Sequence, residues 1–75
     1  MSHLARIFRD NVNQLLEERG MSRSELARRA DMRQPVVARV LNGDMEIMTA
    51  TIERFALALE VPADELIRDH VPAAA

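Results

Sequence analysis

Hydrophobic residues recur along most of the chain at the three- and four-residue spacing of amphipathic α-helices. This spacing predicts a first helix over about residues 4–19, and Gly20 follows it as a C-terminal stop. Its apolar positions are Leu4, Ile7, Phe8, Val12, Leu15 and Leu16. The chain lacks the alternating β-branched runs that are typical of strands, so we expect an all-α fold.

A capping-box motif, "SRSE" at residues 22–25, predicts the start of a second helix at Arg23. We expect the Ser22 hydroxyl to accept from the backbone N–H of Glu25. The Glu25 carboxylate should reach back to the Ser22 amide. This helix is short and ends near Asp31. Its inward residues are Leu26, Ala27 and Ala30.

The segment "QPVVARVLNG" at residues 34–43 predicts a third helix. Pro35 marks its start, because the first N–H groups of a helix have no intrahelical partner for proline to remove. Proline also disfavours the helical conformation for the residue before it, so we expect Gln34 at or near the cap. At about 100° per residue, Pro35 and Arg39 point away from the core, with Val36 on a flank. The inward sector holds Val37, Val40 and Leu41.

Two further helices are predicted in the C-terminal half. The first runs from about residue 50 to residue 60 behind a Thr49 cap, and Pro62 opens the second, within "ADELIRD". The inward residues of these helices are expected to be Ile52, Phe55, Ala56 and Leu59, with Leu66 and Ile67 offered by the last helix. We therefore expect one domain over residues 1–70 and a flexible tail over residues 71–75.

Composition excludes several classes of protein. With 75 residues the chain has room for one small domain. It has no cysteine, and its two histidines stand near opposite ends, so we expect no metal site and no cofactor. No apolar run approaches the roughly 20 residues that a membrane span needs. Charges interrupt the N-terminus, unlike a signal peptide, and a soluble cytoplasmic protein is expected.

Charge is distributed unevenly along the chain, although the total is only −2. Residues 19–43 carry six arginines against two acids, a net charge of +4, whereas residues 44–75 carry a net charge of −5. The basic segment covers the predicted second and third helices. A local basic surface of this kind is the electrostatic signature of nucleic-acid binding.

Two short helices joined by a tight turn have the form of a helix-turn-helix. The segment "MSRSELARRADMRQPVVARVLNG" resembles the helix-turn-helix of the phage Cro and cI repressor superfamily, the XRE family, whose members commonly read similar to "lsqeeLAekaGvsqptisriLnG". The similarity continues through "TIERFALALEVPADELI" and covers about residues 8–68. It implies a compact five-helix lambda-repressor-like domain, with the helix-turn-helix at its second and third helices.

The resemblance implies that the third helix enters the major groove of DNA. The positions that read bases in this family correspond here to Gln34, Pro35 and Arg39. Either Pro35 or Val36 can pack on a thymine methyl group. Glutamine pairs bidentately with adenine and arginine with guanine. Phosphate contacts are expected from Arg23, Arg33 and Asn42.

Some of these residues have simpler alternative roles. Surface arginines are commonly just solvated, and Arg28 can pair with Glu25 or Asp31, so Arg28 and Arg29 are left unassigned. Val36 can equally be an ordinary exposed hydrophobic residue.

The sequence departs from its family at three places. Relatives carry Ser or Thr where this chain has Arg33, which cannot accept a hydrogen bond, so the third helix should lose about 1 kcal/mol of capping. Asp44 and Glu46 follow the Asn-Gly pair where relatives often have basic residues, so this loop is not expected to contact DNA. Leu16 and Leu41 replace a buried ion pair of phage repressors, and we expect them to touch.

These features favour a sequence-specific transcriptional regulator, a phage or bacterial repressor that binds a pseudo-palindromic operator as a homodimer. The expected dimer interface comprises Met45, Ile47, Met48, Leu66 and Ile67. Ile47 and one Met can instead cover the core. An antitoxin-like protein-binding module on the same fold is the alternative function. Catalysis is not expected, because no nucleophile has a neighbouring base.

Overall fold

The computed structural model describes residues 2–70, which form five helices and no strand. These are α1 (His3–Arg19), α2 (Arg23–Arg29), α3 (Gln34–Asn42), α4 (Thr49–Leu59) and α5 (Ala63–Ile67). The all-α prediction is confirmed. The tail predicted at residues 71–75 lies outside the described residues. None of the helices within residues 2–70 has the length and apolar character to cross a membrane.

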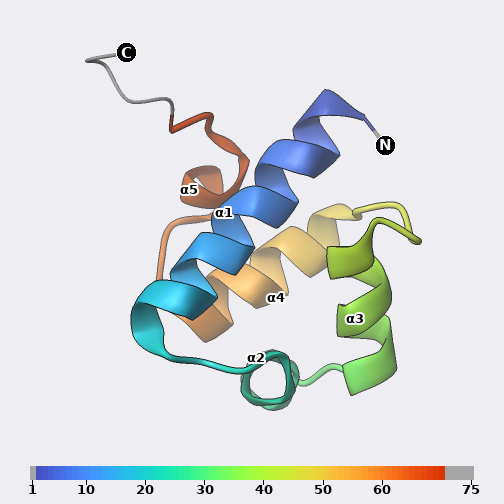
Figure 1. Cartoon of the computed structure of the whole chain (residues 1–75), viewed down its shortest axis with the longest axis vertical. Coiled ribbons are helices and arrows are strands. Elements are labelled where there is room, and N and C mark those ends of the chain that lie inside the picture. The colour runs from blue at the N-terminus through green and yellow to red at the C-terminus, as the bar shows by residue number, and fades with distance from the viewer. Residues whose placement is uncertain (1, 71–75) are drawn as a thin grey trace.

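The helices form two neighbouring groups around one core. As Figure 1 shows, α2 and α3 lie together at one end of the molecule, away from the start of α1. α2 packs against α3, α1 packs against α5, and α4 contacts both α2 and α5. The two helices of the predicted helix-turn-helix are therefore supported by the rest of the domain, α2 by α4 and α3 by α1.

Local capping accounts for the starts of the first two helices. The Ser2 hydroxyl accepts from the N–H of Ala5 at 3.1 Å, so α1 begins one residue earlier than predicted. Gly20 ends α1 in the left-handed conformation, with φ of 61°. The Ser22 hydroxyl accepts from the N–H of Glu25 at 3.1 Å, as predicted. The second half of the capping box is wrong, because the Glu25 carboxylate turns instead to arginines later in α2.

The starts of α3 and α4 have no side-chain cap. Arg33 is the cap residue of α3, so Gln34 is its first helical residue rather than its cap. The prediction that Thr49 caps α4 is wrong, since Thr49 is the first residue of this helix and Met48 is the cap. The helix starts earlier because the Met48 carbonyl accepts from the N–H of Thr51 at 2.9 Å.

Fourteen buried hydrophobic residues form a single core, and all five helices contribute to it. The rings of Phe8 and Phe55 stack at its centre, with centroids 5.6 Å apart. Leu16 and Leu41 are both in this core, and their direct contact stays a prediction. Leu4, an apolar position of the predicted first helix, lies outside this core and is 52% exposed.

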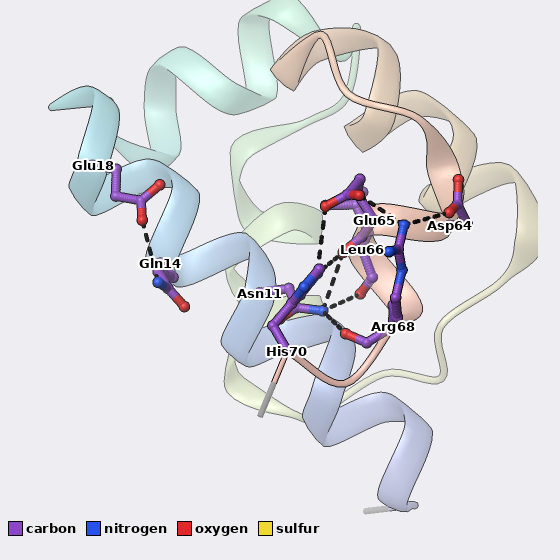
Figure 2. A network of polar contacts seen from close by, with 8 residues as sticks. All are labelled: Asn11, Gln14, Glu18, Asp64, Glu65, Leu66, Arg68 and His70. Carbon is purple, nitrogen blue, oxygen red and sulfur yellow. Dashed lines mark hydrogen bonds and ion pairs between the residues drawn. The ribbon is translucent and has the colours of Figure 1, made fainter. Parts of the chain in front are cut away.

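Asn11 of α1 holds the end of α5, which has only five residues (Figure 2). Its amide Nδ2 donates to the carbonyl oxygens of Leu66 at 3.0 Å, Arg68 at 2.8 Å and Glu65 at 3.3 Å. The last carbonyls of a helix have no intrahelical partner, and Asn11 supplies one from another element. This contact keeps Leu66 seated in the core although α5 is too short to be stable alone.

Candidate DNA interface

The turn between α2 and α3 is tight, and small residues allow the two helices to approach. Ala27 and Ala30 are buried where α2 meets the rest of the domain. Asp31 then adopts the left-handed conformation, with φ of 55°. The N–H of Met32 returns to the carbonyl of Ala27 at 2.9 Å. This closed turn sets the direction in which the chain enters α3.

The face of α3 predicted to meet DNA is the face that the core leaves open. Gln34, Pro35 and Arg39 are exposed, whereas the inward residues Val37, Val40 and Leu41 are buried. Val36 lies between the two faces and packs partly against the core, so only part of its side chain is open to a partner.

The predicted phosphate contacts lie at helix ends on either side of this face. Arg23 and Asn42 meet directly, since Arg23 Nη1 donates to Asn42 Oδ1 at 3.0 Å. This hydrogen bond joins the start of α2 to the end of α3. Arg33 is exposed at the start of α3.

The six arginines of the basic segment differ in their partners. Glu25 Oε2 accepts from Arg29 Nε at 2.7 Å, and Glu25 Oε1 accepts from Arg28. The predicted pairing of Arg28 with Glu25 is thus confirmed. These hydrogen bonds, first that of Arg29 and then that of Arg28, hold the pKa of Glu25 below its ordinary value. Within residues 2–70, the other four arginines have no carboxylate partner. Arg19 donates to the carbonyl of Leu59, which leaves Arg23, Arg33 and Arg39. Their charges are thus available to an anionic ligand.

Comparison with known proteins agrees with this geometry. A helix-turn-helix family model matches residues 12–66, which include α2, α3 and their turn. The chain belongs to the XRE helix-turn-helix family. A search of curated protein sequences finds no match. Among solved structures, the restriction-modification controller protein C.AhdI from Aeromonas hydrophila is similar, with a TM-score of 0.74 and 25% identity over 80% of this chain and 91% of that chain.

Family and structural likeness together identify this XRE domain as a DNA-binding transcriptional regulator. The basic, exposed face of α3 is accordingly the candidate site of contact with double-stranded DNA. The resemblance to Cro and cI repressors inferred from residues 21–43 is confirmed.

The predicted dimer interface of this XRE domain is only partly at the surface. Met45 and Met48 are 37% and 66% exposed. Ile47 and Ile67 are half-buried and pack against the core, as the alternative role of Ile47 predicted. Leu66 is fully buried, so its assignment to a surface is wrong. The five-residue α5 turns Leu66 into the core and leaves Ile67 at its edge.

A hollow of about 500 Å³ lies beside Met45. The first turn of α1, the loop between α3 and α4, α4 and α5 all border it. Apolar residues of its lining include Leu4, Phe8, Met45, Ile47, Ile52 and Ile67. This surface is separate in sequence from the basic face and carries the acids Asp44 and Glu46.

Two arginines make contacts between distant parts of the chain that the sequence does not predict. Arg19 donates to the carbonyl of Leu59, and Arg54 Nη1 donates to the carbonyl of Asp31 at 2.9 Å. Each contact joins residues that are distant in the chain. A surface arginine in a helix has many such acceptors within reach, so helical periodicity alone does not select one.

Proposed function

We propose that this XRE domain is a homodimeric repressor that binds a pseudo-palindromic operator with one α3 in each of two major grooves. The observation that carries the proposal is the exposed face of α3, where Gln34 and Arg39 stand opposite the buried valines. The similarity to a restriction-modification controller protein supports a regulatory role. A domain bound across a promoter represses by excluding the polymerase from the same DNA.

Base reading is assigned to the exposed residues of α3. Gln34 presents an amide that matches adenine N6 and N7, and Arg39 presents two N–H groups that match guanine O6 and N7. Five residues of helix rise about 7.5 Å, so the two side chains reach positions about two base pairs apart. Pro35 and the open part of Val36 suit a thymine methyl group.

Phosphate binding is assigned to the helix ends. Arg23 and Asn42, already joined by a hydrogen bond, form one cluster, and Arg33 forms a second contact at the start of α3. Backbone N–H groups at the starts of α2 and α3 add to the attraction for phosphate oxygens. These contacts orient the domain and carry no sequence information.

Dimerisation is assigned to the acidic half of the chain. One short helix buries too little surface to specify a site alone, and two half-sites about 34 Å apart solve this through symmetry. Met45 and Met48 form the exposed apolar part of the proposed interface, with Ile47 and Ile67 at its edge. The acids of this region face away from DNA in the bound dimer.

Selection from a random pool of DNA duplexes tests the proposal. We expect enrichment of a pseudo-palindrome, and an operator placed over a promoter should reduce reporter expression when the protein is present. With four to eight phosphates neutralised per dimer, log K should fall with log salt at a slope of roughly −4 to −7. Affinity that ignores salt between about 50 and 200 mM contradicts DNA binding. A monomer that enriches no sequence favours the protein-binding alternative.

A further inference from the structure

The turn between α2 and α3 is held from outside the helix-turn-helix by Arg54 of α4. Its Nη1 donates to the carbonyl oxygen of Asp31 at 2.9 Å, across 23 residues of chain. Asp31 is one of two non-glycine residues with positive φ within residues 2–70. An L residue adopts this conformation at a cost in free energy, and it persists where the surroundings hold it.

The peptide unit between Asp31 and Met32 has both of its polar groups occupied. Its carbonyl accepts from Arg54 of α4, and its N–H donates to the carbonyl of Ala27 of α2 at 2.9 Å. The peptide plane is therefore fixed between two helices. One residue later comes Arg33, the cap residue of α3, which makes no side-chain capping bond. The start of α3 thus depends on this peptide rather than on a local cap.

We propose that Arg54 is a positioning residue for sequence-specific DNA binding, an inference that rests on the proposed function. The guanidinium of Arg54 sets the peptide before α3 and thereby the depth and angle at which α3 meets the bases. A charged donor makes a stronger hydrogen bond than a neutral one, which suits this role. Recognition geometry tolerates errors of about 0.5 Å, so loosening this peptide should weaken base reading more than phosphate binding.

The test compares Arg54→Gln and Arg54→Lys with the parent on three DNAs: the selected operator, its single-base variants and an unrelated duplex. Arg6→Gln is the matched control, because Arg6 is exposed on α1 and its replacement changes the net charge equally. Circular dichroism confirms folding, and sedimentation confirms an unchanged dimer. Should Arg54→Gln not fold, Arg54→Met keeps the apolar stem and carries the same comparison.

We expect Arg54→Gln to lose about 5-fold or more in operator affinity relative to Arg6→Gln, the scale of a modest coupling between separate sites. Discrimination among single-base variants should fall too, while affinity for the unrelated duplex and the salt slope match the Arg6→Gln control. Arg54→Lys, which keeps a charged donor, should restore most of the discrimination.

Two results would overturn the inference about Arg54 without contradicting the proposed function. If Arg54→Gln keeps the base discrimination of the control, the contact does not position α3. If Arg54→Gln loses affinity for the operator and for the unrelated duplex alike, and the magnitude of its salt slope falls by about one unit per half-site, Arg54 is a phosphate ligand. A parent that selects no operator refutes the proposed function itself, and the inference with it.

Discussion

Replacing Arg39 by alanine is the most direct perturbation of the proposed recognition helix. Arg39 is exposed and outside every ion pair within residues 2–70, so the free energy of unfolding should change by no more than about 0.5 kcal/mol. One base contact is worth about 1–3 kcal/mol, and the dimer loses two of them. The sum, about 2–6 kcal/mol, corresponds to a loss of about 30-fold or more in operator affinity.

The assay titrates the selected operator and its single-base variants at fixed salt. Arg39→Ala should abolish preference at one base pair of each half-site, and Gln34→Ala at a different one. Arg23→Ala should weaken all sequences alike and reduce the magnitude of the salt slope by about one unit for each phosphate that is no longer neutralised. Arg28→Ala is the control, because it removes an exposed arginine of the same motif whose charge is already paired with Glu25.

One result would refute the assignment of α3. If Arg39→Ala folds normally, binds the operator as tightly as the parent and keeps the same base preferences, the exposed face of α3 is ordinary solvated surface. The contact with DNA would then have to lie on another element.

Three further predictions concern the supports around the site. Asn11→Ala leaves the last carbonyls of α5 without their donor, so the free energy of unfolding should fall by about 1–3 kcal/mol in a denaturant titration. Arg33→Ser supplies the missing cap of α3 and should stabilise the domain by about 1 kcal/mol, while operator affinity falls and the salt slope flattens. Met45→Ser with Met48→Ser should shift sedimentation toward the monomer, and an unchanged dimer would place the interface elsewhere.

Helix positions were readable from the sequence where the determining interaction is local. Ser22 and Gly20 act within four residues of their own position, and helical periodicity separates the buried side of α3 from the open one. The start of α4 was misplaced because no side chain caps it. A threonine near a helix start serves equally as cap or as first residue, and the backbone at Met48 decided between them.

The sequence predicted which residues belong to the candidate site but not which contacts they make. Periodicity and family resemblance placed Gln34 and Arg39 on one exposed face. The hydrogen bond between Arg23 and Asn42 joins residues 19 positions apart. It depends on the packing angle between α2 and α3, and no sequence pattern reports that angle. The contact of Arg54 with the turn has the same origin.

The starts of the helices differ in whether a side chain caps them. Ser2 and Ser22 cap α1 and α2 with side-chain hydrogen bonds, whereas α3 and α4 begin behind Arg33 and Met48, which make none. A capping residue at either of the latter positions would stabilise its helix by about 1 kcal/mol. Arg33 is the cap residue proposed to contact phosphate, and Met48 is the cap residue proposed to contact the second subunit. If the proposed roles hold, both positions carry a side chain suited to a partner at the expense of a local hydrogen bond, which is the pattern expected where function overrides local preference. Pro62 at the start of α5 also makes no side-chain capping bond, and no partner is assigned to it.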